Sequence, residues 1–127
     1  MMNRRNADAV ARYEERVKRE DEAPRLHDEV PRLLTLRIEL DECRQDDDSL
    51  LLSHARHIVV DRAPARFTIL CGDSECVDGG YRLTRQVMNE LRSGSTVFEG
   101  QEDCGGRRNG EFCLRRVHFT ARATYAE

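Results

Sequence analysis

Four of the five cysteines in this chain form two close pairs. Four residues separate Cys71 from Cys76, and eight residues separate Cys104 from Cys113. Both intervening segments contain glycine, which frees the backbone to turn tightly and wrap around a cation. Two thiolate pairs on short loops supply the four sulfur ligands of a tetrahedral zinc site. The spacing therefore predicts a structural metal site made by these four cysteines, with Zn²⁺ as the cofactor.

Other roles for the four cysteines stay open at this point. An iron–sulfur cluster also takes four cysteine ligands, although its usual spacings are tighter. The thiols could instead remain reduced without a metal, or they could form disulfides. A catalytic zinc is disfavoured, because four thiolates close the coordination shell and leave no position for water.

Segments with strand patterns flank both cysteine pairs. Residues 66–70 read as a strand that enters the first loop, and the alternating residues 117–125 read as a long strand after the second loop. A further strand is predicted over residues 34–40, where Leu34, Leu36, Ile38 and Leu40 share one face. Shorter strands are predicted over 57–61 and 96–98. We expect the two cysteine loops to meet at one end of the resulting sheet.

Two helices are predicted. Residues 84–93 carry a buried-type stripe, with Thr84 as a candidate N-cap and Gly94 as the stop. Residues 6–20 form the other helix, whose apolar stripe of Val10, Tyr13 and Val17 is narrow. Such a helix needs a surface to dock on, either within the chain or on a partner.

These elements predict an α+β fold. It comprises a small antiparallel sheet of three to four strands, one packed helix, a four-cysteine metal site at one end, and an N-terminal helical arm. We divide the chain into the arm at 1–24 and a zinc-stabilised α+β domain at 32–127. Because only 39% of the residues are hydrophobic, the core is thin, and a bound metal would add stability.

The cysteine arrangement resembles that of a zinc ribbon, over about residues 66–120. In that family two cysteine loops at strand ends grip one metal ion. The resemblance implies a zinc-binding domain and, since zinc ribbons often serve transcription and translation, a nucleic-acid or ribosome-associated role. The loops here are wider than the two-residue knuckles usual in zinc ribbons.

The charge distribution limits the partners. The formal net charge is −3, which requires neither a nucleic acid nor an anionic membrane. The nucleic-acid alternative would use basic side chains in the second loop and on the last strand, namely Arg107, Arg108, Arg115, Arg116, His118 and Arg122. The first residues contain no apolar signal segment and no run long enough to span a bilayer, so a cytoplasmic location with reduced thiols is expected.

No catalytic constellation is apparent, so the sequence favours a non-enzymatic binding or regulatory domain. The expected partner is another protein, or a second copy engaged through the N-terminal helix. A further alternative is a thiol redox switch that releases zinc on oxidation. Cys43, the odd thiol, lies among acidic residues that raise a thiol pKa, and we therefore expect it to be unreactive.

Overall fold

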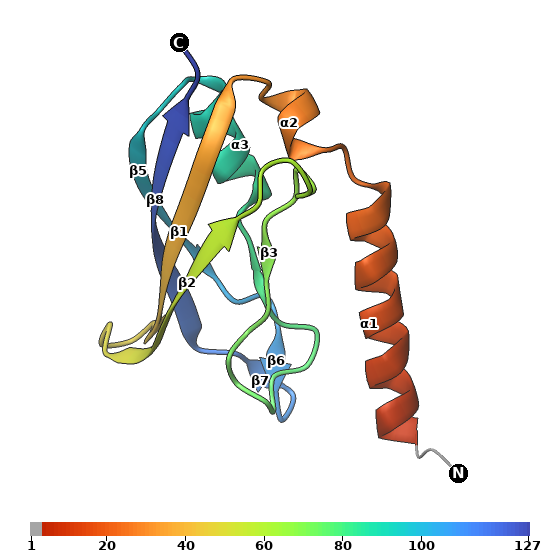
Figure 1. Cartoon of the computed structure of the whole chain (residues 1–127). Coiled ribbons are helices and arrows are strands. Elements are labelled where there is room, and N and C mark those ends of the chain that lie inside the picture. Colours follow the sequence, from red (N-terminus) through yellow and green to blue (C-terminus); the bar gives the residue numbers. More distant parts are fainter. Residues whose placement is uncertain (1–3) are drawn as a thin grey trace.

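The computed structural model describes residues 4–127 as a four-stranded sheet with helices and loops on one side (Figure 1). The helices are α1 (Arg4–Glu22), α2 (Leu26–Glu29) and α3 (Thr84–Arg92). The strands are β1 (Leu33–Arg44), β2 (Leu50–Ile58), β3 (Thr68–Ile69), β4 (Tyr81–Arg82), β5 (Val97–Asp103), β6 (Arg107–Arg108), β7 (Glu111–Phe112) and β8 (Arg115–Tyr125).

The main sheet has the order β2-β1-β8-β5, and its neighbouring strands all run antiparallel. The long strands β1 and β8 form its centre. In β8 the side chains of Val117, Phe119, Ala121 and Ala123 are buried, as their alternation predicts. Two short ribbons, β3–β4 and β6–β7, lie outside this sheet. The α+β class is thus confirmed, and the antiparallel sheet has four strands where three to four were predicted. The strand predicted over residues 66–70 is not one of them, because β3 pairs only with β4.

The core fills the space between one face of the sheet and α3. Val87, Met88 and Leu91 of α3 are buried there, and Phe98 meets Phe119 edge to face at 6.4 Å between ring centroids. Gly94 adopts a positive φ of 76° at the end of α3, a conformation that suits glycine. The stop at Gly94 is confirmed.

The predicted N-cap at Thr84 is wrong. Leu83 takes the N-cap position of α3, and no side chain caps the helix there. The hydroxyl oxygen of Thr84 instead accepts a hydrogen bond from the backbone N–H of Phe67, at 2.8 Å. Thr84 therefore ties the helix to the segment before β3 rather than satisfying the helix's own amides.

A β-bulge overturns the prediction for Leu34. The β1–β8 register shifts between Leu33 and Thr35, which leaves Leu34 as an extra residue. Leu33 consequently points into the core, whereas the Leu34 side chain is 58% exposed. Strict alternation predicts Leu34 on the buried face, and the single extra residue reverses its direction.

The second strand lies earlier than residues 57–61. β2 ends at Ile58, and Val59 opens a turn in which its carbonyl accepts hydrogen bonds from the N–H groups of Arg62 and Ala63, both at 3.0 Å. Residues 50–57 are mostly exposed on both faces, so they carry no apolar alternation to reveal a strand. Pairing with β1 defines β2, which is a tertiary interaction.

Helix α1 stands beside the rest of the chain and joins it through a short connector (Figure 1). In this connector the carbonyl of Pro24 accepts a hydrogen bond from the N–H of Ala65 at 2.7 Å. The Leu26 side chain is fully buried and packs α2 into the core. Val10 and Tyr13 are exposed on α1, the latter by 59%. In the part of the chain that the structure describes, no helix combines the length and apolar character needed to cross a bilayer.

The bulge makes a quantitative prediction for β1. We expect Leu36→Ala to lower the free energy of unfolding by about 2–5 kcal/mol, because Leu36 is only 2% exposed and its loss leaves a cavity. Leu34→Ala removes the same atoms from an exposed site and should change the free energy of unfolding by no more than about 0.5 kcal/mol. Urea denaturation measures both, and equal losses would contradict the bulge.

Candidate metal centre

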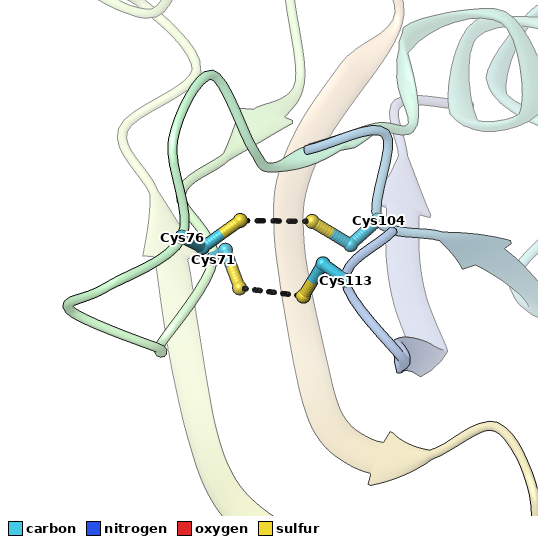
Figure 2. A group of neighbouring side chains, drawn as sticks. All are labelled: Cys71, Cys76, Cys104 and Cys113. Carbon is cyan, nitrogen blue, oxygen red and sulfur yellow. Dashed lines mark hydrogen bonds between the residues drawn. The ribbon is translucent and has the colours of Figure 1, made fainter. Parts of the chain in front are cut away.

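The structure brings the four paired cysteines to one point (Figure 2). Their sulfur atoms all lie within 4.8 Å of one another. The Sγ atoms of Cys71 and Cys113 are 3.9 Å apart, and those of Cys76 and Cys104 are 3.7 Å apart. Four thiolates about 2.3 Å from a tetrahedral metal ion lie about 3.8 Å from each other. The cluster therefore has the dimensions of a four-thiolate metal site.

Strand ends deliver the thiols to this point. Cys71 follows β3, Cys104 directly follows β5, and Cys113 lies just before β8. Since β5 and β8 are antiparallel neighbours, the end of one and the start of the other lie at the same end of the sheet. The N–H of Cys104 donates to the carbonyl of Arg115 at 3.0 Å, which extends this pairing into the site.

The two cysteine loops are also joined to each other by backbone hydrogen bonds. The N–H of Val77 donates to the carbonyl of Arg107 at 2.7 Å, and the N–H of Arg107 donates to the carbonyl of Val77 at 3.0 Å. The N–H of Gly105 donates to the carbonyl of Gly80 at 3.4 Å. The relative position of the two cysteine pairs is thus set by the backbone as well as by the sulfur atoms.

Two glycines let the loops approach closely around the sulfurs. A β-carbon on Gly79 would lie 2.2 Å from Sγ of Cys76 and 2.9 Å from Sγ of Cys104. One on Gly106 would lie 2.5 Å from Sγ of Cys76 and 2.4 Å from Cα of Gly79. No side chain fits at either position, so both glycines are required by the geometry of the cluster.

Backbone amides favour the ionised form of one thiol. The N–H groups of Gly80 and Gly106 donate to Sγ of Cys104 at 3.3 and 3.5 Å. Burial opposes ionisation of Cys104, yet these amides and the neighbouring thiols outweigh it and lower its pKa. Burial raises the pKa of Cys71 to about 12, and it also raises the pKa of Cys76. A cation in the cluster would offset this cost, because coordinated thiols are deprotonated.

Arg108 links the two loops from outside the cluster. Its guanidinium pairs with Glu75 at 2.7 Å and with Asp73 at 3.5 Å, and both carboxylates belong to the first cysteine loop. Arg107 instead lies over the ring of Phe112, with 4.4 Å between Cζ and the ring centroid. Arg107 and Arg108 therefore contact side chains of the two cysteine loops and not the sulfur atoms.

A buried carboxylate supports the first loop from the sheet side. Glu42, 1% exposed, accepts hydrogen bonds from the N–H of Gly72 at 2.8 Å and from the Tyr81 hydroxyl at 2.9 Å. Burial, and then the hydrogen bond to Glu42, raise the pKa of Tyr81. Arg115 and His54 approach the same carboxylate, each at 3.9 Å. Because Gly72 follows Cys71, Glu42 fixes the backbone next to a candidate ligand.

Sequence reasoning missed Glu42, although a signal was present. The residue continues the series Leu36, Ile38 and Leu40, so a strand that buries those side chains also directs Glu42 inward. An acidic residue at a core-facing position needs partners, and that requirement could have identified it. Its partner Tyr81, by contrast, lies far away in sequence and is supplied by the tertiary structure.

The six nucleic-acid candidates do not form one basic surface. Arg108, Arg115, Arg116 and His118 each face a carboxylate of the same chain, and Arg107 covers Phe112. Arg115 lies on the Glu42 side of the sheet, whereas Arg116 and the next alternate residues face the other way. Arg122 is exposed beside Arg37 on β1. The acidic partners cancel most of the positive charge that phosphate binding would need.

Cys43 lies outside the four-cysteine cluster. It is buried, and burial followed by the carboxylates of Asp48 and Asp41 raises the pKa of its thiol, in agreement with the sequence expectation. His118 and Asp48 lie nearby and are joined at 2.8 Å. Asp48 lies in the β1–β2 turn, where it has a positive φ of 59°. Its contact with His118 holds this turn against β8.

Comparisons with protein family models, with curated proteins and with solved structures find no match for this chain. The resemblance to zinc ribbons is thus carried by the four cysteines and their placement at strand ends. The cluster is compatible with a metal site, independent of any family assignment.

Glu42 provides a test of how the site is supported. We expect Glu42→Ala to lower the free energy of unfolding by about 2 kcal/mol or more, because the Gly72 amide and the Tyr81 hydroxyl lose their acceptor. Metal retention against a chelator should also weaken by about 10–100-fold. Tyr81→Phe removes one hydrogen bond and should cost about 1 kcal/mol. If the Glu42→Ala protein were as stable as the Tyr81→Phe protein and retained metal equally well, Glu42 would not support the site.

Proposed function

We propose that this protein is a non-enzymatic binding domain whose fold is stabilised by one zinc ion, and that it acts by binding another protein. The single observation that carries the zinc assignment is the convergence of Cys71, Cys76, Cys104 and Cys113 at tetrahedral spacing. Zinc is favoured because it takes four thiolates in this geometry without a redox role. Four protein ligands leave no open position for a substrate, which argues for a structural ion.

The short ribbons explain why such an ion would matter. The two ribbons that present the loops, β3–β4 and β6–β7, have strands of two residues each, too short to be stable alone. Structural zinc contributes on the order of 10 kcal/mol to folding, which is comparable with the whole stability of a small domain. The ion would therefore hold the two cysteine loops and their ribbons together where apolar burial is limited.

Elemental analysis tests the metal assignment. We expect one zinc ion per chain in purified, untagged protein, and loss of both the metal and the folded state in Cys71→Ser and Cys104→Ser variants. Cys43→Ser is the matched control, because Cys43 lies outside the cluster, and it should retain the ion. If the wild-type protein is folded but contains no metal, the zinc assignment is wrong. If the analysis finds iron and inorganic sulfide, the site holds an iron–sulfur cluster and not zinc.

The surface of α1 supports a protein partner. Val10 and Tyr13 are exposed and Val17 is half-buried, so most of the apolar stripe is not used by the chain's own core. The cleft between α1 and the cysteine loops is lined from the helix by charged residues, namely Arg12, Glu15, Arg16 and Arg19. An amphipathic helix with an uncovered apolar stripe suits docking into a groove of another protein.

Affinity capture with matched variants tests the role of α1. We expect proteins retained by the zinc-loaded wild type to be lost with Tyr13→Ala/Val17→Ala, which removes apolar contact area while keeping a good helix former. The control Glu15→Ala/Arg19→Ala removes an ion pair on another part of the helix and should retain them. Quantitative mass spectrometry measures both, and identical capture by the two variants would contradict docking through this stripe.

A thiol redox switch is the second candidate. Cys71 and Cys76 are only partly buried and line the cleft beneath α1, so an oxidant can reach them. If the switch operates, mild peroxide should convert thiolate pairs to disulfides, with the peroxide reduced to water, and release the metal. A thiol reductant together with zinc should restore the site. Retention of zinc under peroxide, followed with a chromogenic chelator, would exclude this role.

A further inference from the structure

A cavity of about 720 Å³ lies between the end of α1, the β3–β4 ribbon and the start of α3. Its charged lining consists of four arginines and one glutamate, namely Arg19, Glu22, Arg66, Arg82 and Arg85. The chain as a whole has a formal net charge of −3, so this surplus of positive charge is local. Guanidinium groups gathered around a cavity indicate an anionic ligand.

The β3–β4 ribbon brings two of these arginines together. Phe67 and Ile69 are buried in the core, so the alternate residues Arg66 and Thr68 face away from it, towards the cavity. Thr68 lies directly opposite Arg82 in the register of the ribbon, which makes Arg66 a diagonal neighbour of Arg82 on the same face. Like charges at neighbouring positions repel each other, and an anion between them would remove that repulsion.

These arginines also have no acidic partner in the chain. Among the residues whose side chains the structure describes, no carboxylate lies within ion-pair distance of Arg66, Arg82 or Arg85, whereas Arg108 and Arg116 elsewhere are paired. The Nε atom of Arg66 is buried and has no hydrogen-bond partner among them. A buried donor on a charged group is costly when it is unpaired, so this atom requires an acceptor.

We propose that this cavity binds the phosphate group of a small phosphate monoester. Arginine donates two parallel N–H bonds to phosphate oxygens, so Arg66 and Arg82 can hold the group from two sides. The Thr68 hydroxyl, opposite Arg82 on the ribbon, can donate a further hydrogen bond. Arg85 adds positive charge from the first turn of α3, which contains no acidic residue.

The charge of the cavity matches that of a phosphate monoester. Arg19 is already paired with Glu15 on α1. Arg66, Arg82 and Arg85 supply three positive charges and Glu22 one negative charge, which leaves a surplus of two. A phosphate monoester carries about −1.5 to −2 at pH 7. The cavity can therefore neutralise one such group without a metal ion.

A single phosphate fits this site better than a chain of phosphates. The neighbouring cleft between α1 and the cysteine loops contains the carboxylates of Asp73, Asp78, Glu102 and Asp103. A nucleic acid that continued along this groove would meet negative charge. The proposed site uses neither the apolar stripe of α1 nor the cysteine cluster, so its test is separate from those of the protein partner and of the zinc ion.

Isothermal titration calorimetry on the zinc-loaded full chain tests the site. We expect inorganic phosphate and glycerol 3-phosphate to bind with dissociation constants on the order of 1 mM or below, in about 0.15 M sodium chloride. Arg82→Ala should weaken the binding of glycerol 3-phosphate at least about tenfold, because it removes a charge-assisted contact. Arg82 is exposed, so its truncation should leave the fold intact. Arg66→Lys should also weaken binding, since lysine keeps the charge but lacks the planar fork.

Arg122→Ala is the matched control. It removes the same charge from an exposed arginine on the other face of the sheet and should leave the affinity unchanged. Equal weakening by Arg122→Ala and Arg82→Ala would overturn the proposal, as would no binding of either phosphate compound at up to about 10 mM. If inorganic phosphate alone binds, or if an oligothymidylate without a terminal phosphate binds more tightly than glycerol 3-phosphate, the monoester assignment is wrong.

Discussion

The convergence of four thiols on one point is the constraint on which the rest of the structure depends. Around it the chain makes ribbons of two residues per strand, and two glycines lie so close to the sulfur atoms that no side chain would fit there. Neither ribbon has the length to persist in isolation. The backbone bridge between Val77 and Arg107 joins the two cysteine loops beside the sulfur atoms. The sheet supplies the platform, since β5 ends and β8 begins at the cluster.

A buried acid connects that platform to the cluster. Glu42 ends the apolar series of β1 and holds the amide that follows Cys71. Its carboxylate also accepts the Tyr81 hydroxyl, so sheet, β4 and the first cysteine loop share one polar network. Buried networks of this type are costly when incomplete and rigid when satisfied. The network therefore makes the position of the first cysteine pair depend on the sheet.

The surfaces left uncovered lie on different parts of the molecule. The stripe on α1 is helical, amphipathic and attached through a short connector, which suits a groove on a partner. The β2 edge is extended, and the bulge at Leu51 interrupts it near its start. The four-cysteine cluster lies in the loops beside α1, and Cys71 and Cys76 line the cleft between the helix and these loops.

The sequence alone predicts the four-cysteine cluster, because paired cysteines on glycine-bearing loops beside strands have few other arrangements. It also predicts α3 and the alternation of β8, where apolar periodicity is strong. The bulge at Leu34, the position of β2 and the partners of Glu42 are decided by the tertiary structure. Each depends on register or contact between segments distant in sequence, and local propensity carries no information about a distant neighbour.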